Sequence, residues 1–215
     1  MGSGNALIEQ IANGEAPSLV PLSVAQYHVM LEKGILREGD AIELVQGLLV
    51  RRNRAAAGED EMTHGPRHAQ VISRLLKLAR ALEPLGCHLR VQLPVTLSDL
   101  DEPEPDLAIV KGSLEAFADR HPGPTDLLAV FEVSDSSLGY DRGTKSRVYA
   151  AAGIPVYVIV NLPDLQIERY DRPAPAEARY QGRTDHGPGH ALVIPLTAGH
   201  ALTLNVDEAL GAPKR

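Results

Sequence analysis

The segment "LLAVFEVSDSSLGYDRGTKSRVYAAAGIPVYVIV", residues 127–160, decides the fold. It opens and closes with apolar runs of the kind that form buried strands. Between these runs, the residues at i, i+3, i+4 and i+7 from Lys145 share one face, which predicts a helix from about Thr144 to Ala152. A buried strand, a helix and a second buried strand are typical of a parallel crossover in a mixed α/β sheet.

The first of these strands contains one charged residue, Glu132, directly after an apolar run. An ionised carboxylate buried without a partner is costly, so Glu132 needs a cation, a proton or a metal ion. A second acid, Asp106, follows Pro105 and begins the short strand "DLAIV", where we expect a strand end with a solvent-facing side. If the two strands are neighbours, both carboxylates can converge on one hard cation that prefers oxygen ligands. The alternative is two unrelated acids, one of which pairs with an arginine.

Lys145 lies on the helix face that we expect to pack on the sheet. The first turn of that helix can lie beside the end of the strand that carries Glu132, so the ammonium and the positive end of the helix dipole would face the acids. Lys145 then either pairs with Glu132 and extends to water, or orients a water for attack on phosphorus and stabilises the developing charge. Asp141 or Thr144 is the expected N-cap of the helix.

The other periodic or alternating segments complete the fold prediction. A helix with Ser23 as its N-cap and a hairpin with its turn at Gln46–Gly47 come first. The predicted segments are helices at 24–34 and 64–82, a hairpin at 41–52, and strands at 87–97, 165–170, 191–196 and 201–206. The fold class is α/β (α+β), a mixed sheet flanked by helices with extra β-hairpins, in a single domain at 21–210 after an N-terminal extension at 1–20.

The composition limits the functional classes. The net charge of −7 has the wrong sign for a protein that coats nucleic acid by charge alone, but a nuclease with an acidic metal site remains compatible with it. No apolar run approaches the roughly 18–20 residues of a membrane span, and the first residues lack the basic and apolar regions of a secretory signal. With Cys87 as the single cysteine, no intrachain disulfide can form, which fits a cytoplasmic protein.

Several motifs in their order and spacing resemble the Uma-type putative restriction endonuclease family, which belongs to the PD-(D/E)XK nuclease superfamily. They are "EPD" (104–106), "FEVS" (131–134), "YDRGTK" (140–145) and "YAAAGIPVYVIV" (149–160), with "IELVQGLLV" (42–50) and "HGPRHAQVISRLL" (64–76) upstream. The resemblance covers residues 22 to 170. It implies a restriction-endonuclease-like core in which Asp106 and Glu132 bind Mg²⁺ or Mn²⁺ and Lys145 is catalytic, with DNA as the substrate.

The sequence departs from the superfamily at the position two residues after the Glu. The usual lysine there is Ser134 in this chain, and the Uma-type pattern supplies Lys145 from the following helix instead. The family's aromatic pair near the last strand is reduced to Tyr157, and its acid after that strand is Asn161.

Glu43 and His68 match a Glu and a His of the same family and are supporting candidates for the catalytic site. Otherwise Glu43 is a solvent-facing or arginine-paired hairpin residue, and His68 is a histidine at the edge of the core. His64 and His68 also have the i, i+4 spacing of helical zinc ligands, which leaves a small-molecule metal hydrolase as a third interpretation.

The sequence thus predicts a metal-dependent endonuclease that hydrolyses DNA phosphodiester bonds. The main alternative is a catalytically inactive nuclease-like module that binds nucleic acid or protein. Homodimer formation stays open. Candidate contacts to the DNA backbone are Arg51, Arg52, Arg54, Arg67, Arg74 and Arg142.

Overall fold

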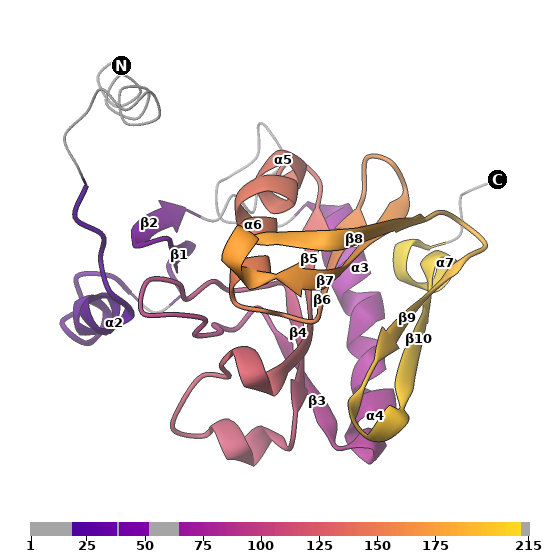
Figure 1. Cartoon of the computed structure of the whole chain (residues 1–215), viewed down its shortest axis with the longest axis horizontal. Coiled ribbons are helices and arrows are strands. Elements are labelled where there is room, and N and C mark those ends of the chain that lie inside the picture. The colour runs from indigo at the N-terminus through magenta and orange to yellow at the C-terminus, as the bar shows by residue number, and fades with distance from the viewer. Residues whose placement is uncertain (1–18, 38, 52–64, 212–215) are drawn as a thin grey trace.

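The computed structural model describes residues 19–37, 39–51 and 65–211 (Figure 1). At its centre lies a six-stranded sheet in the order β3-β4-β5-β6-β7-β8. β5 and β6 run parallel, and the other four neighbouring pairs run antiparallel. The strands are β3 (Cys87–Val91), β4 (Leu107–Lys111), β5 (Leu127–Ser134), β6 (Val156–Asn161), β7 (Gln166–Ala174) and β8 (Arg179–His186). The predicted mixed sheet with a parallel crossover is confirmed.

The crossover helix between β5 and β6 is longer than the sequence predicts. It consists of α5 (Leu138–Tyr140), a π-helical segment (Asp141–Lys145) and α6 (Ser146–Ala151). The predicted N-caps therefore lie inside the helix, and the predicted start at Thr144 is wrong. The physical reason is that the Asp141 carboxylate accepts hydrogen bonds from the hydroxyls of Ser134 and Ser137, not from the first free backbone N–H groups.

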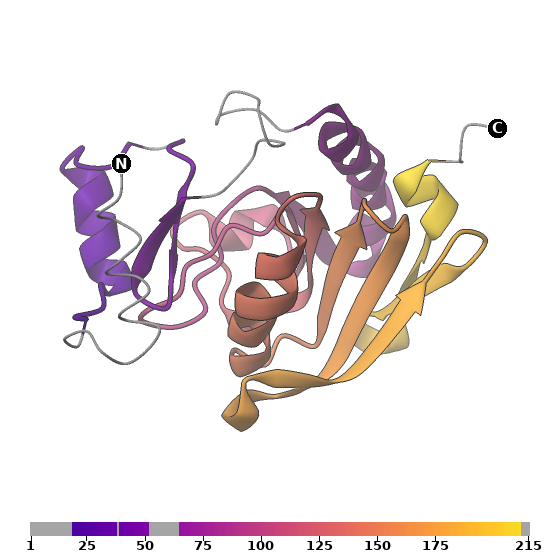
Figure 2. The same cartoon turned by 90° about the horizontal axis from the view of Figure 1, so that it is seen from above.

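Helices cover both faces of the sheet, as Figure 2 shows. On one face lies α3 (Pro66–Leu75), which continues through short helical turns, including α4 (Ala79–Leu82), to residue 85. The same face is covered by the hairpin of β9 (Ala191–Pro195) and β10 (Ala201–Asn205) and by α7 (Val206–Leu210), whose apolar side chains share one core with α3. On the opposite face, Val148 and Tyr149 of α6 pack on the strands.

The N-terminal elements lie to one side of the sheet (Figure 2). α2 (Val24–Glu32) begins with Ser23 in a capping box, as predicted. β1 (Ile42–Val45) and β2 (Leu48–Arg51) form the predicted hairpin. Its turn uses positive φ at Gln46 and Gly47, and a Cβ at Gly47 would come within 2.3 Å of Pro21. The hairpin therefore needs glycine for both its turn and its packing.

Two predictions about strands differ from the structure. The strand expected at 87–97 ends at Val91, because Gln92 adopts a positive φ and Pro94 cannot continue the ladder. β8 was not predicted at all, because its sequence "RYQGRTDH" lacks apolar alternation. It lies at the edge of the sheet, where a mostly polar strand is tolerated. None of the described helices is long and apolar enough to cross a membrane.

Candidate active site

The register between β4 and β5 brings the two predicted metal ligands together. Leu107 pairs with Phe131 across this antiparallel ladder. Continuing the register by one residue places Asp106 opposite Glu132, and the Asp106 N–H lies 3.3 Å from Glu132 Oε2. Because antiparallel partners share a face, both carboxylates lie on the side of the sheet that α6 covers.

Both acids are buried, so the expectation of a solvent-facing side at Asp106 is wrong. Asp106 and Glu132 are each only 6% exposed. The Val133 N–H donates to Asp106 Oδ2 at 2.8 Å, which fixes one carboxylate oxygen against the neighbouring strand. The end of β4 is covered because the preceding loop is tied back to the β1–β2 hairpin, where the Glu102 N–H donates to the carbonyl of Leu44 at 2.8 Å.

Lys145 connects this acid pair to the N-terminal hairpin. Its Nζ lies 2.7 Å from Glu43 Oε2 and 3.1 Å from Glu132 Oε1, and its side chain is 4% exposed. Lys145 does lie beside Glu132, as one interpretation predicted. The same interpretation also predicted that the side chain extends to water, and that part is wrong because the side chain is buried. Burial alone would lower the pKa of Lys145, but Glu132 and Glu43 raise it above its usual value, so the amine is an ammonium.

The ionisation of Glu132 is strongly shifted by its surroundings. Burial raises its pKa to about 8, Lys145 opposes that rise, and the nearby Asp141, Asp106 and Glu43 add to it. The Tyr149 hydroxyl donates to Glu132 Oε1 at 2.8 Å. An additional cation that reaches this buried carboxyl group would stabilise its ionised form.

Glu43 and His68 both reach this cluster. Glu43 is 1% exposed and accepts from the Glu104 N–H at 3.0 Å as well as from Lys145, so it is neither solvent-facing nor paired with an arginine in the described residues. His68 Nε2 lies 3.0 Å from Asp106 Oδ2. The five predicted residues therefore form one connected group, although they come from five separate segments of the chain.

Ser134, which occupies the usual lysine position, supports the helix that carries Lys145. Its hydroxyl donates to Asp141 Oδ2 at 2.6 Å, as does the Ser137 hydroxyl. The Tyr157 hydroxyl donates to the Asp141 carbonyl at 3.1 Å. These bonds hold the π-helical segment against the strand ends, and segments of this type are frequent at functional sites.

Sequence reasoning missed two residues of this group, Tyr149 and Asp141. Tyr149 had a signal, because it lies four residues after Lys145 on the same predicted face. Asp141 lies four residues before Lys145, but because it was predicted to cap the helix, it was not considered as part of the site.

The proposed DNA-contacting arginines of the described residues are largely committed to internal contacts. Arg67 donates to the carbonyl of Leu162 at 2.9 Å, and Arg74 donates to the carbonyl of Leu210 at 2.7 Å. Arg142 binds the buried carboxylate of Glu168. Arg51 ends β2 and is exposed. Arg52, Arg54 and His64 lie outside the described residues, so the predicted pair of His64 and His68 has only its second member described.

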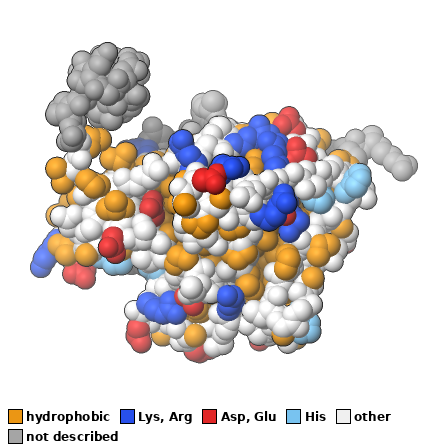
Figure 3. All heavy atoms as spheres, viewed as in Figure 1, with side chains coloured by type: hydrophobic (Ala, Val, Ile, Leu, Met, Phe, Trp, Pro, Cys, Tyr) orange, Lys and Arg blue, Asp and Glu red, His pale blue; other side chains and the backbone are white. Residues whose placement is uncertain are grey.

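The surface over α5, α6 and β8 mixes both charge signs (Figure 3). On β7 and β8, Arg172, Arg179 and Arg183 each lie within ion-pair distance of a neighbouring acid. Such a mixed surface is not the concentrated basic patch expected of a protein that binds nucleic acid through charge alone.

The donor set fits a hard divalent cation. The Asp106 and Glu132 carboxylates supply oxygen ligands of the type that Mg²⁺ and Mn²⁺ prefer. They lie on adjacent strands in one register, and Glu132 has a pKa that favours a cationic partner. Lys145 stands next to Glu132 with its charge balanced in part by Glu43.

Comparisons with known proteins identify the family and the fold of the chain. The sequence profile of the Uma2 family, described as putative restriction endonuclease, matches residues 24–207. Among solved structures, a putative nuclease from Anabaena variabilis ATCC 29413 superposes with a TM-score of 0.61 at 12% identity, covering 88% of this chain and 98% of that chain. At this identity the likeness concerns the fold, and it confirms the predicted restriction-endonuclease-like architecture. None of the curated proteins matches the sequence.

Proposed function

The chain belongs to the Uma2 family of putative restriction endonucleases, and we propose that it is an endonuclease that hydrolyses DNA phosphodiester bonds with Mg²⁺ or Mn²⁺. The observation that carries the proposal is the convergence of two buried carboxylates, Asp106 and Glu132, beside the buried ammonium of Lys145. A divalent ion held by two carboxylates can supply Lewis acidity and a nucleophilic water, and a nearby lysine can stabilise the developing negative charge.

Asp106 and Glu132 would hold the ion, which supplies Lewis acidity at the scissile phosphate. Both side chains are oriented before an ion arrives. Asp106 is held by the Val133 N–H and lies against His68, and Glu132 is held by the Tyr149 hydroxyl. Hydrogen bonds of this type orient metal ligands and raise affinity.

Lys145 would orient the attacking water or stabilise the charge that develops on the phosphate. Its ammonium form at neutral pH suits charge stabilisation, because a group that stays protonated is a poor general base. Glu43, with Oε2 at 2.7 Å from Nζ, helps to position this ammonium.

The charge balance favours a further cation. Glu43 and Glu132 lie within ion-pair distance of Lys145, and Asp141, Asp106 and Glu43 are close enough to raise the pKa of Glu132. A divalent ion would offset the remaining negative charge, and the Glu132 carboxyl group would then ionise as it binds.

A plasmid cleavage assay tests the proposal. Supercoiled DNA is incubated with the parent protein and Mg²⁺, Mn²⁺ or EDTA, and the yields of nicked and linear product are compared. The variants are Asp106→Asn, Glu132→Gln and Lys145→Met, each checked for folding by circular dichroism. Asp185→Asn is the matched control, because Asp185 pairs with Arg183 on the exposed β8 edge.

We expect metal-dependent cutting that falls at least about 100-fold in the three site variants and stays at the parent level in the control. Cutting that persists in folded Asp106→Asn would overturn the assignment. The ratio of nicked to linear product further separates a protein that cuts one strand from a dimer that cuts both.

If the parent cuts nothing, metal titration decides between an enzyme with a special substrate and the non-catalytic module. A module without turnover has no reason to retain Mn²⁺ affinity that depends on both Asp106 and Glu132. Loss of that dependence would favour the module.

A further inference from the structure

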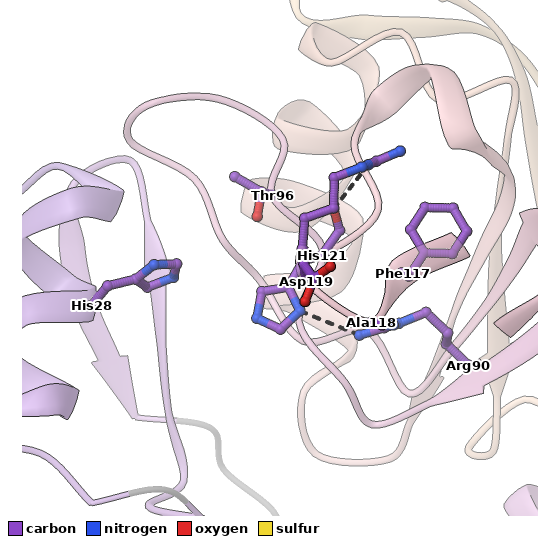
Figure 4. Close-up of a pocket in the computed structure, with 8 residues that line it drawn as sticks. His28, Arg90, Thr96, Phe117, Ala118, Asp119 and His121 are labelled. Carbon is purple, nitrogen blue, oxygen red and sulfur yellow. Dashed lines mark hydrogen bonds between the residues drawn. The ribbon is translucent and has the colours of Figure 1, made fainter. Parts of the chain in front are cut away.

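A second cluster of ligand-type side chains lies away from the acid pair, between α2 and the loops that precede β4 and β5. It consists of His28 on α2, Glu102 in the loop before β4, and His121 in the loop before β5. One potential ligand atom from each residue lies within 4.8 Å of the other two. In Figure 4, His28 points from α2 across the gap toward the side that carries Thr96 and His121.

The centre of this cluster is a carboxylate fixed before any ligand arrives. The Glu102 side chain is 1% exposed, and its Oε1 lies 2.6 Å from His28 Nε2. Its Oε2 accepts from the Thr96 hydroxyl at 2.6 Å. The Glu102 backbone is tied to Leu44 of β1. A buried carboxylate whose second oxygen is held by a hydroxyl is a ligand with its orientation already set.

We propose that His28, Glu102 and His121 bind a transition-metal ion of the zinc class, with an open coordination position toward the adjacent pocket. Two imidazoles and one carboxylate form a donor set that zinc takes, in tetrahedral geometry, with a water or substrate in fourth place. The pocket, of about 640 Å³, supplies room for that fourth ligand and is lined also by Arg90, Phe117 and Arg120.

The required movement is small. Zinc–ligand bonds of about 2.0–2.1 Å in tetrahedral geometry place ligand atoms roughly 3.3 Å apart. The pair of His28 and Glu102 must open by less than an ångström, and the widest pair must close by up to about 1.5 Å. The His28 side chain is 42% exposed and His121 is only partly buried, so both rings have room to turn while Glu102 stays in place.

The donor chemistry separates this site from the acid pair. Asp106 and Glu132 offer oxygen atoms, which suit Mg²⁺ or Mn²⁺, whereas nitrogen donors from two imidazoles favour zinc over these hard ions. A buried carboxylate at the centre also favours a cation over an anion as the occupant.

Two neighbouring groups bear on the protonation state. Burial lowers the pKa of His121, Glu102 raises it, and Arg90 and His28 lower it further, so the ring is neutral at pH 7. Arg90 Nη2 lies 3.4 Å from His121 Nδ1 and 3.3 Å from the carbonyl of Pro94. Arg90 is therefore a competitor for the His121 lone pair, although the contact is long and the Pro94 carbonyl offers an alternative acceptor.

Binding would join parts of the chain that are distant in sequence. His28 belongs to the N-terminal helix, whereas Glu102 and His121 belong to loops of the sheet. An ion held by all three would fix α2 against those loops and stabilise the folded state, because the unfolded chain lacks the preformed site.

The test is zinc binding to the metal-free full chain in the presence of saturating Mg²⁺, which would occupy the proposed site of Asp106 and Glu132. Calorimetry gives the stoichiometry and affinity, and the absorption spectrum of Co²⁺ in place of zinc reports tetrahedral coordination. The variants are His28→Ala, His121→Ala and Glu102→Gln, with the exposed His200→Ala as control. His64→Ala measures any contribution from His64.

We expect one zinc equivalent that raises Tm, and each of the three variants should weaken its binding by roughly 10-fold or more. His200→Ala and His64→Ala should bind as the parent does. Arg90→Met should bind zinc at least as tightly as the parent, because it removes the competing cation. Unchanged zinc affinity in folded His28→Ala and His121→Ala would overturn the proposal, as would a zinc equivalent lost only in His64→Ala.

Discussion

Lys145 and Glu43 are 102 residues apart in the chain, and their side chains meet at 2.7 Å in the interior of the protein. The contact joins the crossover helix to the N-terminal hairpin. The same ammonium also lies 3.1 Å from Glu132 Oε1. Lys145 is thus part of the folded core as well as of the proposed catalytic group, and its replacement should affect stability and activity in separable ways.

Lys145→Met should destabilise the metal-free protein by about 3–5 kcal/mol, because it leaves the buried carboxylate of Glu43 without its cation and removes the ammonium beside Glu132. The double variant Lys145→Met/Glu43→Gln should recover much of that loss, since one unpaired carboxylate is removed as well. Urea denaturation of the parent, both single variants and the double variant measures the coupling. Additive effects of the two substitutions would contradict the buried ion pair.

Metal affinity should depend on pH through Glu132. The pKa of this carboxyl group is raised from 4.5 to about 8 in the folded, metal-free protein, so it carries a proton at pH 7 that an incoming cation must displace. Mn²⁺ affinity should therefore rise about tenfold per pH unit below 8 and level off above it. Calorimetry in buffers of different ionisation enthalpy should detect about one proton released at pH 7 and almost none above pH 9. The release should vanish in Glu132→Gln.

The raised pKa of Glu132 also determines how the stability of the metal-free protein changes with pH. Because the folded pKa of Glu132 lies above its unfolded value, the folded state binds the extra proton between pH 4.5 and about 8. This group's contribution to stability is complete below pH 4.5 and declines as pH rises toward 8. Added Mn²⁺ should offset the decline, which thermal unfolding at several pH values would measure. A decline of equal size in Glu132→Gln would contradict this assignment.

Tyr149→Phe should lower metal affinity by roughly 10- to 100-fold, because it removes the hydroxyl that holds Glu132 Oε1 at 2.8 Å. Tyr180→Phe is a matched control, because the Tyr180 hydroxyl donates to the carbonyl of Ile154. Mn²⁺ titration of both variants separates a positioning role from a purely structural one. Equal affinities in the two variants would show that the hydroxyl does not orient Glu132.

Glu168→Gln should cost stability but leave cleavage unchanged. Burial alone would raise the pKa of Glu168, but hydrogen bonds from Arg142, Asn161 and Tyr170 and the charge of Arg183 lower it from 4.5 to about 2. Because the folded pKa lies below the unfolded one, the ionised Glu168 stabilises the folded state above pH 4.5, and this contribution is lost as the pH falls toward 2. Urea denaturation should show a parent–variant difference at pH 7 that narrows near pH 3. A variant that stays stable but loses cleavage would move Glu168 into the catalytic group.

The sequence by itself determined the central architecture and the chemical types of the candidate site. Two apolar runs on either side of an amphipathic helix were enough to predict the parallel β5–β6 crossover, because strands that are buried on both faces of a sheet are nearly continuously apolar. The acid in "AVFEV" and the lysine on the inner helix face were readable for the same reason, since a charge inside an apolar pattern contradicts that pattern unless it has a partner.

Only the tertiary structure decided which residues these charges meet. The β4–β5 register, the coverage of the strand end by the hairpin and the depth of Asp106 depend on contacts between distant segments, which local periodicity does not encode. The start of the crossover helix escaped prediction because the Asp141 side chain bonds to Ser134 on the preceding strand. The cluster of His28, Glu102 and His121 had no sequence signal, because its members are spread over 94 positions and meet through packing of α2 on the loops.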